Sequence, residues 1–155
     1  MVVNVNESVI LNVVDMNPTI QIEEEIISLN VLSGGLVPSG TSDITLIAGQ
    51  NLSALRVVTM DAGGQAIYAS NTTLANATVL GVTTTAATAG TSVTIATSGL
   101  ITDNSWTWTK GPVFLGTNGT LTQIAPSNGA VLVNVARALT PTTIQIDIDT
   151  TTITV

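Results

Sequence analysis

The sequence predicts an all-β protein, with a compact antiparallel β-barrel or sandwich domain preceded by an extended N-terminal arm of β-strands. Hydrophobic residues make up 45% of the 155 residues, while aromatic residues make up 3% and charged residues 8%, so Val, Ile, Leu and Ala must build the core. Threonine is the most frequent polar residue, and β-branched side chains fit pleated strands better than helices. Short apolar segments also alternate with turn signals at fairly even spacing, which is typical of small barrels and sandwiches.

The first 33 residues form the predicted arm. Its strand-like segments are Val9–Val14, Thr19–Ile22 and Ile26–Leu32, and Asn17-Pro18 marks a turn before the second. The run Glu23–Glu25 favours a solvated turn, with steering toward a basic partner as the alternative. Short hairpins are marginal in water on their own, so we expect the arm to contact another subunit or a partner protein. The residues expected at that interface are Val9, Ile10, Leu11, Val13, Val14, Ile20, Ile22, Ile26 and Ile27.

A Gly/Ser/Pro-rich stretch over residues 34–43 predicts a hinge, and residues 44–149 predict the barrel or sandwich domain. Asp61–Gly64 and Asn118-Gly119 predict hairpin turns, because Gly and Asn tolerate positive φ. In the last predicted strand Ile alternates strictly with polar residues, and residues 150–155 could add an edge strand or a tail. The expected strands are 52–60, 66–70, 78–85, 92–97, 105–110, 113–115, 120–124, 131–137 and 143–149.

The stretch Ser105–Gln123 holds both tryptophans of the chain, Trp106 and Trp108. Side chains two positions apart point the same way in a strand, so we expect the two rings on one strand face, followed by a turn at Gly111-Pro112. Packing in the core or at a domain corner is the first interpretation. A subunit interface is the second, and a ligand platform is the third.

The charge balance bears on partners. Ten acidic residues stand against three basic ones, giving a formal net charge of -7 and no basic patch for phosphate backbones, so we expect no nucleic acid partner. The N-terminus predicts neither a signal peptide nor a membrane span, and no membrane partner is expected. The mean hydropathy of +0.52 indicates that some apolar surface faces another subunit.

Groups for catalysis are scarce, because the chain has no Cys and no His. Acid-base chemistry would fall to carboxylates or to Tyr68. For turn residues such as Asp61 and Asp103, capping of their own backbone is the favoured interpretation, and for Asp147 and Asp149 a solvated strand face is favoured over a cation site. We therefore expect no enzyme and no catalytic, cofactor-binding or metal site.

Several segments carry a resemblance to a known group of proteins. They are Leu55–Ala69 (LRVVTMDAGGQAIYA), Val79–Thr83, Gly90–Gly99 and the run W-T-W-T-K-G-P-V-F-L-G-T-N-G-T-L-T-Q. Residues 50–148 thereby resemble a small β domain of virion structural proteins of tailed bacteriophages, found in capsid decoration (cement) proteins and at the ends of tail fibres.

The resemblance implies a structural role. A cement protein would be made in the host cytoplasm, assemble as a homotrimer, bind between major capsid proteins on the virion surface and stabilise the capsid. The short apolar arm and hinge before the domain favour this role over a fibre, which would carry a long stalk. The alternative is a short tail or head fibre protein that binds a host surface glycan through loops near Trp106, Trp108 and the Asn118-Gly119 turn.

Overall fold

The computed structural model describes residues 41–127 and 129–149, together with the backbone of Ile153–Thr154. By its contacts the chain divides into two units, Met1–Gly35 and Leu36–Val155, and the described fold belongs to the second. The predicted arm, its nine interface residues and residues 34–40 of the predicted hinge lie outside the described residues. Strand β1 begins at Thr41, so the last three residues of that predicted hinge belong to a strand.

Where the structure describes the second unit, it consists of β-strands and two single-turn 3-10 helices, which confirms the all-β prediction. Most strands are close to the predicted segments, and Gly111-Pro112 begins a strand instead of forming the expected turn. The elements are β1 Thr41–Ile47, β2 Val57–Met60, β3 Ala66–Tyr68, η1 Ala75–Ala77, β4 Gly81–Thr83, β5 Ser92–Thr102, β6 Gly111–Leu115, η2 Thr117–Gly119, β7 Leu121–Thr122, β8 Val131–Leu132, β9 Asn134–Thr140, β10 Thr143–Ile146 and β11 Ile153–Thr154.

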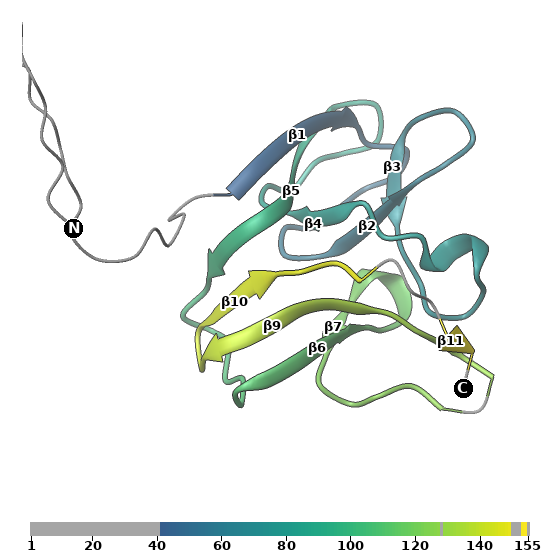
Figure 1. The fold of residues 1–155 in the computed structure, drawn as a ribbon. Coiled ribbons are helices and arrows are strands. Elements are labelled where there is room, and N and C mark those ends of the chain that lie inside the picture. Colours follow the sequence, from purple (N-terminus) through teal and green to yellow (C-terminus); the bar gives the residue numbers. More distant parts are fainter. Residues whose placement is uncertain (1–40, 128, 150–152, 155) are drawn as a thin grey trace, which may run out of the picture. The chain divides into compact units, whose positions relative to one another are not determined.

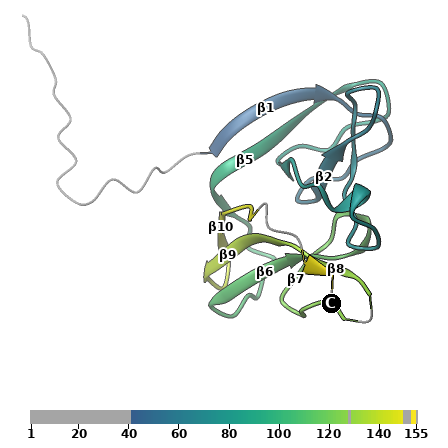
Figure 2. The same cartoon turned by 45° about the vertical axis from the view of Figure 1, so that its right-hand side comes forward.

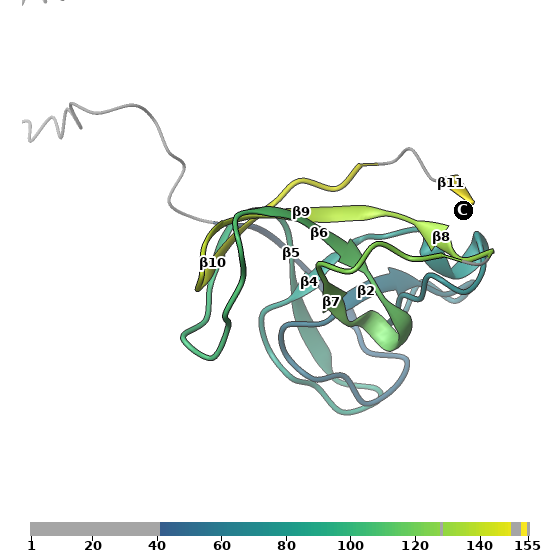
Figure 3. The ribbon, with the colours of Figure 1, turned by 90° about the horizontal axis from the view of Figure 1, so that it is seen from below.

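Nine strands form one antiparallel sheet in the order β3-β2-β4-β5-β10-β9-β6-β7, with β1 also paired to β5 (Figure 1). The sheet curls into a half-barrel, so that β6 and β9 lie on one side and β2 and β4 on the other (Figure 3). The eleven-residue strand β5 joins the two sides, because it pairs with β4 near its middle and with β10 at its end. The short strand β11 pairs with β8, as an added edge strand for the C-terminal residues would.

Two apolar clusters hold the curled sheet together. Strand β2 separates them, since Val57 belongs to one cluster and its neighbour Val58 to the other, and both side chains are fully buried. In β10 the predicted alternation is confirmed: Ile144 and Ile146 are buried and Gln145 is exposed. The larger cluster consists of Val57, Ala69, Ala77, Val82, Ala96, Ile101, Val113, Leu115, Val131, Val133, Val135, Ala136, Ala138, Ile144 and Ile146, and the smaller one of Ala48, Leu52, Val58, Ala66, Val93 and Ile95.

The predicted Asn118-Gly119 turn brings the two ends of the sheet together. It lies in η2 between β6 and β7, with φ of +51° at Asn118 and +68° at Gly119. The Gly119 N–H donates to the Ala69 carbonyl, just after β3, at 2.7 Å. A Cβ at Gly119 would lie 2.4 Å from the Val57 carbonyl oxygen, so only glycine allows this approach. The sheet is therefore closed at this point by a turn, while no strand pair joins β7 to β3 among the described residues.

A tryptophan pocket as candidate functional site

The two tryptophans lie on a loop, and the prediction of a strand over 105–110 is wrong. The backbone of this loop bonds to groups other than a neighbouring strand. The Asp103 carboxylate accepts from the Ser105 N–H, the Trp106 N–H donates to the Asp103 carbonyl, and the Trp108 N–H donates to the Pro141 carbonyl at 2.9 Å. The rings still meet, with centroids 5.7 Å apart and planes inclined by 59°.

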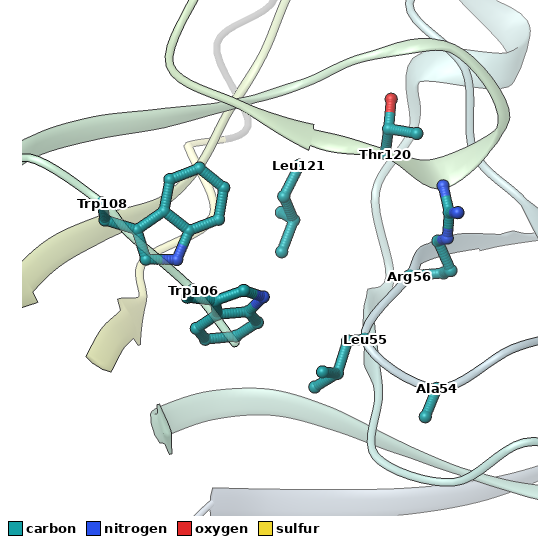
Figure 4. Close-up of a pocket in the computed structure, with 7 residues that line it drawn as sticks. All are labelled: Ala54, Leu55, Arg56, Trp106, Trp108, Thr120 and Leu121. Atoms are coloured by element: carbon teal, nitrogen blue, oxygen red, sulfur yellow. The ribbon is translucent and has the colours of Figure 1, made fainter. Parts of the chain in front are cut away.

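Both indoles are half-buried against the larger apolar cluster and line a pocket of about 380 Å³. Figure 4 shows the two rings on one side of it, Leu121 above, Leu55 and Ala54 below, and Arg56 and Thr120 on the opposite side. This volume falls in the range of small-molecule sites, about 300–1,000 Å³. The lining residues are Ala54, Leu55, Arg56, Trp106, Trp108, Thr120 and Leu121.

The wall opposite the indoles is a bent loop that a buried hydroxyl holds in place. Leu55 has a φ of +60°, a conformation that costs a branched residue about 1–2 kcal/mol. Thr83 of β4 is fully buried, and its Oγ1 donates to the Ser53 carbonyl at 2.8 Å and accepts from the Arg56 N–H at 3.0 Å. The Leu55 N–H also donates to the Thr83 carbonyl, at 2.7 Å. These bonds fix Leu55 and Arg56 at the pocket.

Some polar side-chain groups that line the pocket have no hydrogen-bond partner among the described residues, and all of these groups are donors. The Trp108 Nε1 is buried and has no partner there. The Trp106 Nε1 and the Arg56 guanidinium likewise make no hydrogen bond within the described ranges, and the Thr120 hydroxyl already donates to the Thr117 carbonyl. A molecule in this pocket would therefore meet apolar walls, the positive charge of Arg56 and the N–H groups of Arg56 and Trp106.

The acidic residues considered from sequence serve the backbone or lie on other surfaces. The Asp61 Oδ1 accepts from the N–H groups of Gly63 and Gln65, so the predicted capping of its own turn is confirmed. Hydrogen bonds from the Ser105 side chain and then its N–H lower the pKa of Asp103. Asp147 and Asp149 are exposed just after β10. No group of three or more His, Cys, Asp or Glu side chains that could hold a metal ion occurs within residues 41–127 and 129–149.

Tyr68 also has a structural role in the described fold, since its hydroxyl oxygen accepts from the Ser53 N–H at 2.8 Å.

Within the described residues, no helix is long and apolar enough to span a bilayer. The chain matches no protein-family model and no curated protein.

Sequence reasoning singled out Trp106 and Trp108 and missed the rest of the pocket. Leu55 and Arg56 lie about 50 residues before the tryptophans in the chain, so no spacing connects them. The one available signal was charge, because Arg56 is one of only three basic residues.

Proposed function

We propose that this chain is a structural protein of a bacteriophage virion, a capsid decoration protein that assembles as a homotrimer, binds between major capsid proteins and stabilises the shell. Its work is binding and not catalysis. A ligand that binds only the assembled shell stabilises that shell by mass action. The resemblance of residues 50–148 to virion β domains supports this role, and so does the compact all-β fold.

The observation that carries the proposal is the free edge of β1. Among the described residues this seven-residue strand pairs only with β5 (Figure 2). Most of its side chains are exposed. Ile44 and Ile47 on it are 36% and 43% exposed. An open strand of this kind is a template for another strand, because its second row of N–H and C=O groups lacks partners. The apolar arm segments end at Leu32, with eight residues between them and the start of this strand, which supports strand addition between copies or onto a capsid protein.

Deletion of residues 1–33 tests this function. The full chain should be a trimer by light scattering and should occupy capsids at full stoichiometry, and particles carrying it should withstand higher temperature. The truncated chain should lose both trimerisation and occupancy. A truncated chain that still trimerises and fills the capsid sites would refute the role of the arm. Full-length protein that is absent from capsids by electron microscopy would refute the decoration function itself.

A second candidate is supported by the tryptophan pocket. A short tail or head fibre protein that binds a host surface glycan would present paired aromatic rings beside a few polar groups, as Trp106, Trp108 and Arg56 do here. Immunogold labelling of intact particles separates the two functions, since label on the tail supports the fibre and label over the head supports the decoration protein.

A further inference from the structure

We propose that the tryptophan pocket binds a carboxylated sugar, such as a hexuronic or sialic acid unit of a polysaccharide, with its carboxylate on Arg56 and its ring against the indoles. This inference rests on the second proposed function for its biological setting and names the class of glycan. The same pocket would bind the same sugar in a decoration protein, because all of its lining residues lie within the described domain.

The walls select a ring with an apolar face. Two indoles inclined by 59° form a corner of aromatic faces, and Leu55, Leu121 and Ala54 complete the apolar surface. The face of an indole is the negative end of its quadrupole, so it attracts the weakly positive C–H groups that a pyranose presents on one side of its ring. A flat apolar surface alone would suit many ligands, so the polar groups decide among them.

Those polar groups select a hydrogen-bond acceptor with negative charge. The Arg56 guanidinium and the Trp106 Nε1 can donate to a ligand, and neither has a partner among the described residues, whereas the Trp108 Nε1 is buried. Figure 4 shows the Trp106 nitrogen on the side of its ring that faces Leu55 and Arg56. A guanidinium holds a carboxylate through two parallel N–H···O bonds, which fixes orientation as well as charge.

The surroundings favour an anion over a cation. Among the residues that the structure describes, no carboxylate lines the pocket. An aromatic cage for an ammonium group would not place a guanidinium at its rim, because the two cations repel each other. Asp103 lines a neighbouring depression that shares Ala54 and Leu55 with the pocket, and its carboxylate already accepts two hydrogen bonds from Ser105. In a chain with net charge -7 and only three basic residues, Arg56 brings a positive charge to the aromatic corner, and Thr83 holds its backbone there.

The two tryptophans are the only ones in the chain, so the emission of the full-length protein reports directly on the pocket. The probes are trigalacturonic acid against its methyl ester, and sialyllactose against lactose. The acid sugars should change the emission saturably and bind about tenfold or more tightly than their neutral counterparts, as expected for a charge-assisted hydrogen bond. Binding of one acid alone supports the proposal and identifies the source of the carboxylate.

Arg56→Gln should abolish the preference for the acid sugars and leave the neutral ones almost unchanged. The matched control is Arg137→Gln, which removes the same charge from an exposed position on β9 and should bind like the wild type. Trp106→Phe keeps a ring and removes one donor, and should weaken binding of both acids and neutral sugars. The comparison of acid with ester uses wild-type protein, so it holds even if a variant does not fold.

Four outcomes would overturn the proposal. Equal affinity for acid and neutral sugars would refute the binding of a carboxylate by Arg56. An Arg56→Gln variant that keeps the preference for acid sugars would refute it as well. Either result would leave the glycan-binding function valid. No saturable response to any sugar at about 10 mM, a concentration well above a millimolar Kd, would remove both the proposal and the glycan-binding function. Emission that is shielded from iodide in the absence of sugar, and that added sugar does not change, would show that the protein itself covers the indoles and leaves no room for a sugar.

Discussion

Thr83 should be the most sensitive polar residue of the described fold, and Thr83→Val tests this. Valine has nearly the same shape, so packing is kept while the hydroxyl is lost. The buried hydroxyl serves the Ser53 carbonyl at 2.8 Å and the Arg56 N–H at 3.0 Å, and both lose their partner in the variant. An unsatisfied buried group costs about 1–3 kcal/mol, and these two are partly buried, so we expect a combined loss of about 2–3 kcal/mol.

Urea denaturation followed by tryptophan emission measures this loss. With a slope of about 2 kcal/mol per molar urea, the midpoint should fall by about 1–1.5 M. Thr140→Val is the matched control, because Thr140 is an exposed strand residue whose side chain makes no hydrogen bond within the described residues, and its midpoint should stay within about 0.25 M of wild type. A Thr83→Val midpoint as close to wild type as that would refute the hydroxyl's role in holding the Leu55 loop.

Two further predictions concern a turn and a carboxylate. Gly119→Ala combines a φ of +68° with a Cβ 2.4 Å from a carbonyl oxygen and should cost about 3 kcal/mol or more, whereas Gly90→Ala, with a φ of +83° and open space around it, should cost about 1 kcal/mol; equal losses in thermal denaturation would contradict the steric argument. Because hydrogen bonds from Ser105 lower the pKa of Asp103, the stability it contributes is present above the unfolded pKa and is lost as pH falls through the folded one. Carbon-13 NMR titration should give Asp103 a midpoint below the ordinary Asp range that Ser105→Ala raises, and identical midpoints in the two proteins would overturn this assignment.

Local patterns predicted much of the fold where the sequence itself supplies the constraint. The Ile alternation in 143–149 requires one buried face, and the structure buries Ile144 and Ile146. Asp61–Gly64 forms the β2–β3 hairpin, because the Asp61 carboxylate accepts hydrogen bonds from the turn and Gly64 provides its positive φ. In these segments propensity and tertiary packing agree.

The predictions were wrong where hydrogen-bond partners distant in the chain determine the backbone conformation. The Trp106–Thr109 segment alternates like a strand, yet its N–H groups bond to Asp103, to Pro141 and to the Gln123 side chain, so no ladder forms. The predicted strand 52–60 is interrupted by the bend at Leu55, which Thr83 holds from another strand. Strand β1 extends into a Gly/Ser-rich region because β5 is long enough to pair with it from Ser92 to Gly99.

The walls of the pocket depend on contacts that also stabilise the fold, and this couples binding to stability. Thr120 and Leu121 directly follow the Gly119 turn that joins the ends of the sheet, while Leu55 and Arg56 are held by Thr83 of β4. A ligand that binds only the folded pocket adds about 2.7 kcal/mol of stability at a hundred times its Kd. Since Thr83→Val loosens one of these walls, that variant should bind the acid sugars more weakly and gain less stability from them than wild type. A variant that is destabilised yet gains the full increment would show that the pocket forms independently of the Thr83 contacts.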